Sequence, residues 1–126
     1  MYVYQQEDNT VAICSKQSSI PEGATWKEVE SVPDSVFRSA WRIVGDAVVT
    51  NIDSAKLITH DLRRVQRQLA FAPLDAIIAL QIPGNDATQA EADRLVIRNA
   101  DDAMQIDIND CTTEQELIDI HITEGL

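Results

Sequence analysis

The spacing of apolar residues changes once along the chain, near residue 52. Before that point, short apolar runs alternate with turn-forming clusters, which is typical of β-strands. After it, apolar residues recur at alternating steps of four and three, which is typical of a long amphipathic helix. This change predicts an α+β protein, with a small antiparallel β module over residues 1–51. A long antiparallel helical hairpin and a short acidic C-terminal helix are expected over residues 52–126.

Five short apolar runs, each bounded by turn-forming residues, predict the strands of the β module: residues 2–4, 10–14, 26–32, 40–44 and 47–50. Pro33 ends the third run, and one helical turn is expected after it. Gly45 and Asp46 separate the last two runs and predict a tight hairpin turn. We expect these strands to form one small antiparallel sheet that ends near Asn51.

The first helix of the predicted hairpin begins after Asn51, with Asp53 or Ser54 as its expected N-cap. Its apolar residues form one narrow stripe, which we expect to pack against the second helix: Ile58, Leu62, Val65, Leu69, Ala72, Ala76 and Ala79. Pro73 lies inside this stripe and predicts a kink or a break, because proline removes a helical hydrogen bond.

Residues 82–87 contain Pro, Gly, Asn and Asp, and they predict a reversal of the chain. A second helix is expected from there to about residue 110, and its own stripe should face the first helix: Ala92, Val96, Asn99, Ala103 and Ile106. Two residue pairs with capping-box spacing then predict the start of the short C-terminal helix: Thr112 with Gln115, and Thr113 with Glu116.

The charge of the chain is strongly acidic and unevenly distributed. The net charge of −11 argues against nucleic acid as a partner, because sequence-independent binding to it needs lysine and arginine facing the phosphates. Residues 100–126 contain eight acidic residues and no lysine or arginine. They predict either a solvated acidic face or a docking surface for a basic partner. A basic cluster on the first helix is available to pair with them: Lys56, Arg63, Arg64 and Arg67.

The sequence contains no motif that indicates catalysis, a metal site or a cofactor site. Cys14 and Cys111 stand outside any zinc or redox spacing, so we expect both to act as small apolar residues. His60 and His121 are expected to be ordinary surface or boundary residues. No apolar run reaches the ~20 residues that span a membrane, and the first residues lack a signal pattern. We therefore expect a cytoplasmic protein that is not an enzyme and has no membrane partner.

Several segments between residues 36 and 120 occur in a characteristic order: 37–43 (FRSAWRI), 45–50 (GDAVVT), 53–61 (DSAKLITHD) with Arg63 and Arg64, 71–75 (FAPLD), Pro83-Gly84, 112–114 (TTE) and Glu116-Leu117. This arrangement resembles small phage proteins found with tail fibres, including the tail-fibre assembly (chaperone) family. The resemblance implies a β-rich module joined to a helical hairpin. It also implies a protein that acts by binding other proteins, in phage morphogenesis or in the virion.

The partner that this resemblance implies is a phage tail-fibre protein or another tail protein. The expected contact residues combine apolar side chains of both parts with acidic ones: Phe37, Trp41, Ile43, Val48, Leu74, Ile77, Ile78, Asp101, Asp107 and Asp110. For Phe37 and Trp41 the alternative is core packing, because a chain with few aromatic residues usually buries them. Leu74, Ile77 and Ile78 give the first helix apolar residues on more than one face, which favours a homo-oligomer.

Three classes of function remain open from the sequence. The first is a tail-fibre assembly chaperone that binds fibre protein in the host cytoplasm during phage assembly. The second is a structural component of the virion that packs through its helical hairpin. The third is an acidic inhibitor of a host protein, with mimicry of nucleic acid as its extreme form.

Overall fold

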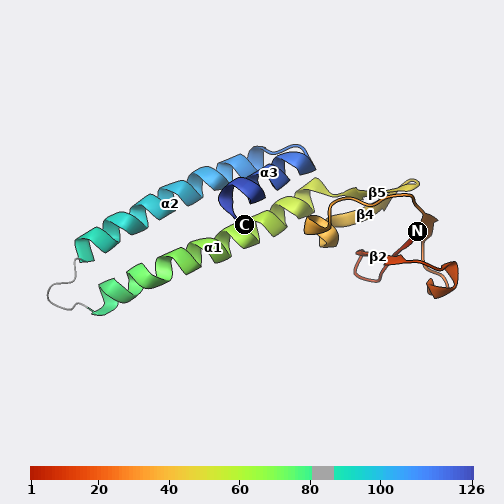
Figure 1. Ribbon diagram of the computed structural model, residues 1–126, viewed down its shortest axis with the longest axis horizontal. Coiled ribbons are helices and arrows are strands. Elements are labelled where there is room, and N and C mark those ends of the chain that lie inside the picture. Colours follow the sequence, from red (N-terminus) through yellow and green to blue (C-terminus); the bar gives the residue numbers. More distant parts are fainter. Residues whose placement is uncertain (81–86) are drawn as a thin grey trace. The chain divides into compact units, whose positions relative to one another are not determined.

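The computed structural model describes residues 1–80 and 87–126 and divides into two compact units, Met1–Ala55 and Lys56–Leu126. The strands and residues 52–55 belong to the first unit, and the rest of the helical hairpin forms the second with the C-terminal helix (Figure 1). The predicted α+β class is confirmed, with small antiparallel sheets followed by two long helices and a short one. The reversal predicted at residues 82–87 lies outside the described residues, apart from Ala87.

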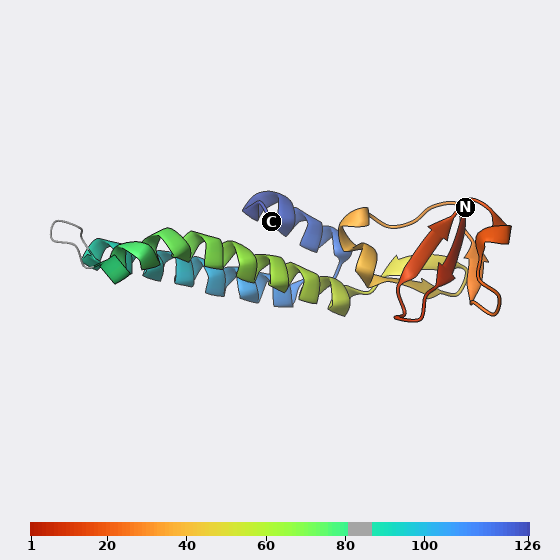
Figure 2. The same cartoon turned by 90° about the horizontal axis from the view of Figure 1, so that it is seen from below.

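The first unit contains two antiparallel sheets instead of the single sheet that was predicted (Figure 2). Their strands are, in chain order, β1 (Tyr2–Gln5), β2 (Val11–Cys14), β3 (Trp26–Glu28), β4 (Trp41–Val44) and β5 (Ala47–Thr50). β1 lies between β2 and β3, while β4 pairs only with β5. Two short 3₁₀ helices lie between strands, η1 (Gln17–Ser19) and η2 (Ser35–Ala40), and η2 is the helical turn expected after Pro33.

Strand β3 is shorter than the alternating pattern predicted, because it ends at Glu28 instead of residue 32. Glu28 lies opposite Tyr2, the first residue of β1, in the register of the sheet. The Val29 N–H still donates to the carbonyl oxygen of Met1 at 2.9 Å. Residues 30–32 have no β1 residue opposite them, so their alternation cannot extend the ladder.

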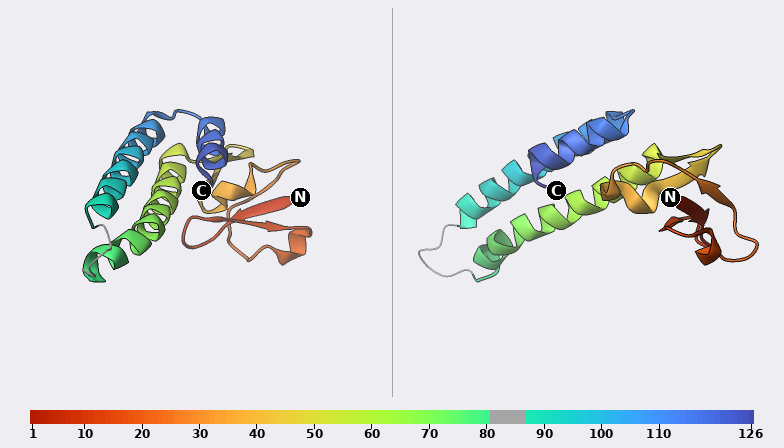
Figure 3. Two further views of the ribbon diagram at one scale, coloured as in Figure 1. Left: turned by 60° about the vertical axis from the view of Figure 1, so that its left-hand side comes forward. Right: turned by 45° about the vertical axis from the view of Figure 1, so that its right-hand side comes forward.

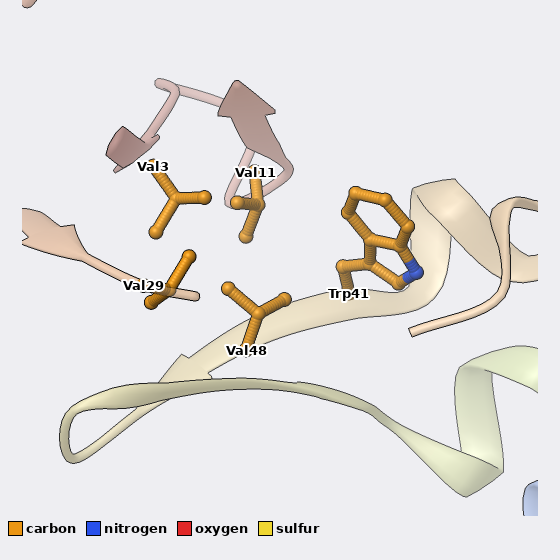
Figure 4. Packing of buried hydrophobic residues seen from close by; sticks show 5 residues of the cluster. All are labelled: Val3, Val11, Val29, Trp41 and Val48. Carbon is orange, nitrogen blue, oxygen red and sulfur yellow. The ribbon is translucent and has the colours of Figure 1, made fainter. Parts of the chain in front are cut away.

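A cluster of buried apolar side chains joins the two sheets of the first unit (Figure 4): Val3, Val11, Val29, Trp41 and Val48. Val32 and Ile43 are partly buried against it. The indole N–H of Trp41 donates to the backbone carbonyl of Asp34 at 3.3 Å, so the polar atom of this buried ring has a partner. Sheets this small are marginal alone, so the shared cluster is what stabilises them.

Helix α1 (Ile52–Leu80) is a single helix, and two local predictions about it are wrong. Its cap is Asn51, whose side-chain oxygen accepts from the Ser54 N–H at 2.9 Å, instead of Asp53 or Ser54. The helix also continues through Pro73, so the expected break does not occur. Proline leaves the carbonyl of Leu69 without its helical donor. Because both residues lie on an exposed face, water can bind that carbonyl.

Helix α2 (Ala87–Asp110) runs antiparallel to α1, and α3 (Glu114–Glu124) returns beside α1 (Figure 3). The prediction for α2 is confirmed at both ends. Of the two capping pairs predicted for α3, Thr113 with Glu116 is confirmed, because Thr113 is the N-cap and its hydroxyl oxygen accepts from the Glu116 N–H at 3.3 Å.

Candidate functional site

The face between α1 and α2 is polar over much of its length. Arg63 and Arg67 on α1 each donate from Nη1 to the same oxygen of Asp101 on α2, at 2.7 Å and 2.8 Å. Arg63 and Asp101 are only 3% and 4% exposed, whereas the Arg67 side chain is partly open to solvent. These three residues form an ion triad in which the Arg63–Asp101 pair is buried. Part of the basic cluster therefore pairs with the acidic C-terminal segment, as predicted.

A hydrogen-bond chain extends this polar face toward the start of α1. The Arg63 Nε–H donates to His60 Nδ1 at 3.3 Å, and His60 Nε2 lies 2.8 Å from the side-chain oxygen of Asn109. Because Nδ1 accepts and the amide oxygen can only accept, His60 carries its hydrogen on Nε2. Lys56 donates to the Asn109 backbone carbonyl at 2.9 Å. This network positions one long helix against the other.

The other end of the hairpin is more apolar. Phe71, Leu74 and Ile78 continue the helical spacing of His60, Arg63 and Arg67, and all three are partly buried. Arg94 on α2 stacks over the Phe71 ring at 5.1 Å from its centroid and makes an ion pair with Asp75 at 3.1 Å. The hairpin thus combines an ionic part with an apolar part.

Helix α3 packs beside α1 through both apolar and polar residues. Leu117 is fully buried, and the His121 imidazole shares a hydrogen bond of 2.9 Å with the Thr59 hydroxyl. Gln66 donates to the backbone carbonyl of Glu124 at 2.9 Å. Burial lowers the pKa of His121 below its ordinary value of about 6.5, because the charged imidazolium loses solvation there.

This pKa shift predicts that the helical unit loses stability as the pH falls below about 6.5. The unfolded chain binds a proton at His121 more readily than the folded chain does, so acid favours unfolding. Urea unfolding at about pH 7.5 and about pH 5.5 measures this dependence. The His121→Gln variant keeps a hydrogen-bonding group but cannot titrate, so its unfolding free energy should change less between the two pH values. An equal change in both proteins would contradict the assignment.

The apolar stripe of α1 faces away from α2, which contradicts the predicted packing. We define the α1 stripe as its six exposed members: Leu62, Val65, Leu69, Ala72, Ala76 and Ala79. Val65 is 56% exposed and Leu69 is 70% exposed, while Ile58 is half-buried. The residues with partners on α2 lie on the opposite side of the helix, because the ion triad and the His60–Asn109 hydrogen bond form there.

The apolar stripe predicted for α2 is also on the outside. All five of its members are exposed, and the buried residues of α2 are Ala90, Asp101 and Ile108. Leu95 is exposed as well. We define the α2 outer patch by five exposed apolar side chains that share one face of this helix: Ala92, Leu95, Val96, Ala103 and Ile106. Asp107 and Asp110 are exposed on the same helix next to the end of this patch, so they remain accessible to a partner.

Several expected contact residues are not on the surface of the folded chain. Phe37, Trp41 and Val48 are buried, which corresponds to the core-packing alternative, and Ile43 is half-buried against the Trp41 cluster. Asp101 is 4% exposed, and its carboxylate is held by Arg63 and Arg67 in the ion triad. The remaining apolar candidates on α1 are partly buried: Leu74, Ile77 and Ile78.

The described residues contain no group of three or more His, Cys, Asp or Glu placed to hold a metal ion. Cys14 and Cys111 are both free thiols, and burial raises the pKa of Cys111. Within residues 1–80 and 87–126, no helix combines the length and apolar character needed to span a membrane. The α1 stripe and the α2 outer patch are exposed apolar surfaces on the two long helices, and Ile122 of α3 is exposed as well. The helical spacing of apolar residues identifies both long-helix surfaces in the sequence. The prediction that these surfaces lie between the two helices is wrong.

Comparison with protein-family models, curated proteins and solved structures finds no match to this chain.

Proposed function

We propose that this protein is a non-enzymatic tail-fibre assembly chaperone, which binds fibre protein in the host cytoplasm during phage morphogenesis. The observation that carries the proposal is the exposure of large apolar side chains on the outer faces of both long helices. Exposed apolar patches of this kind mark protein-binding surfaces. The phage assignment rests on the resemblance of residues 36–120 to the tail-fibre assembly family.

The α2 outer patch is the surface that we assign to the fibre protein. It carries Val96 and Ile106, and the exposed carboxylates of Asp107 and Asp110 lie next to its Ile106 end, so it offers both apolar area and negative charge. Fibre proteins trimerise through long-range β pairing, which is slow and leaves apolar edges exposed before assembly is complete. A helper that covers such edges would prevent their aggregation.

The test is co-expression with a phage tail-fibre protein, followed by size-exclusion chromatography with light scattering. We expect a soluble complex, and we expect mass spectrometry to find the protein absent from purified particles. The Val96→Glu/Ile106→Glu variant should lose the complex. The matched control Gln105→Glu/Gln115→Glu adds the same charge at exposed polar positions of α2 and α3 that lie outside the α2 outer patch, and it should keep the complex.

A second candidate is a structural component of the virion, which the regular α1 stripe favours because such a stripe can pack along a neighbouring helix. Presence of the protein in finished particles at fixed stoichiometry would replace the chaperone proposal with this one. Absence of both complex and incorporation would contradict both and favour an acidic binder of a host protein.

A further inference from the structure

We propose that the α1 stripe is an interface between two copies of this chain, which pack their α1 helices antiparallel. The proposal rests on the order of side chains along the stripe and does not depend on the fibre-binding proposal. The stripe recurs at steps of three and four residues, so a partner helix can follow it along its whole length. α1 is already folded in the hairpin, so binding does not have to order it.

The α1 stripe consists of a large half followed by an alanine half. Leu62, Val65 and Leu69 come first, and the three alanines follow. An antiparallel copy centred between residues 70 and 71 brings each large residue opposite an alanine of the other copy: Leu62 opposite Ala79, Val65 opposite Ala76, and Leu69 opposite Ala72. Each layer then holds one large and one small side chain, which fills the space between the helices evenly.

A parallel copy in register lacks this fit. It places leucine against leucine in one half and alanine against alanine in the other, so the helix axes would have to converge along the stripe. A two-fold interface requires a surface that is complementary to itself, because every contact between two residues occurs twice, once from each copy. The α1 stripe meets this requirement in the antiparallel order, and this property favours a second copy over an unrelated apolar partner.

The charge of this face also permits self-association. The chain as a whole is strongly acidic, and two copies repel each other at long range. The excess acid, however, lies in residues 100–126, while α1 itself contains four basic and three acidic residues. The side chains beside the centre of the stripe include Gln66, Gln68 and Pro73, which are uncharged. Two α1 helices therefore meet with little repulsion.

Light scattering and sedimentation equilibrium of the purified full chain test the interface. We expect a mass twice that of the 14.0 kDa chain at micromolar concentration. The Leu69→Glu variant should raise the dissociation constant about 100-fold or more, because a carboxylate would be buried against Ala72 of the other copy. The matched control Val96→Glu changes an equally exposed residue of the α2 outer patch and should leave the dimer intact.

A pair of size exchanges tests the antiparallel order. The Ala72→Leu variant places leucine against Leu69 of the other copy and should weaken the dimer about tenfold through overpacking. The Leu69→Ala/Ala72→Leu double variant restores one large and one small residue in that layer, so its affinity should return to within about threefold of wild type. Circular dichroism shows whether each variant keeps its helical content.

The proposal is overturned if the wild-type chain is a monomer, or if Leu69→Glu leaves the dimer unchanged. It is also overturned if Ala72→Leu strengthens the dimer, because a parallel pair would place position 72 of one copy against position 72 of the other and would gain apolar contact there. The fibre-binding test uses variants of α2, so failure of one proposal is distinguishable from failure of the other.

Discussion

The Asp101→Ala variant is expected to lose about 3–5 kcal/mol of the free energy of unfolding of the helical unit. The Asp101 carboxylate is buried and accepts from both Arg63 and Arg67. Its removal leaves the guanidinium of Arg63, which is almost fully buried, without the charge that offsets its desolvation. Urea denaturation followed by far-ultraviolet circular dichroism measures the loss without the ionic screening that guanidinium chloride would add.

The adjacent Asp102 provides a matched control for this prediction. Asp102 is exposed, so Asp102→Ala should change the free energy of unfolding by less than about 0.5 kcal/mol. An equally small loss in Asp101→Ala would contradict the ion triad. Replacing the whole triad, as Arg63→Leu/Arg67→Met/Asp101→Leu, should recover most of the stability, because no buried charge is then left without a partner. That result would mean that the triad determines which face of α1 packs against α2 and contributes little to net stability.

The choice of packing face is the main feature that sequence reasoning could not predict. Two stripes on α1 share the helical period: the apolar one through Leu62 and Leu69, and a polar one through His60, Arg63 and Arg67. Periodicity identifies both and does not say which one meets α2. The usual rule buries the apolar stripe, and here Asp101 and Asn109 supply partners for the polar one. An apolar stripe left outside is then available for another chain.

Features fixed by neighbouring residues were predicted more accurately. The bounds of α2 and the Thr113 cap of α3 follow from local signals, namely breaker residues and capping-box spacing. The division of the strands into two sheets depends on long-range pairing, because β1 lies between β2 and β3 while β4 finds its partner in β5. Short apolar runs do not encode that choice, and the length of β3 depends on where β1 begins.

The Trp41→Ala variant is expected to destabilise the first unit by about 3–5 kcal/mol, through the cavity left by a large buried side chain. Trp41 is 2% exposed and packs with valines from both sheets, so the cavity would open where the sheets are joined. A unit of this size has a small core, and total stabilities of about 5–15 kcal/mol are typical of whole domains. We therefore expect Trp41→Ala to unfold much of this unit, as measured by amide hydrogen exchange and thermal melting.

Trp26 provides a control for this prediction. It helps to distinguish core packing from partner binding, the two roles that the sequence left open for Trp41. Trp26 is 40% exposed, so Trp26→Ala should cost less than about 1 kcal/mol although it removes the same side chain. Trp41→Phe keeps most of the apolar volume and should recover much of the loss. If Trp41 were a docking residue, Trp41→Ala would instead melt like wild type and lose only its protein partner. Burial of the ring and its hydrogen bond to Asp34 argue for the core-packing outcome.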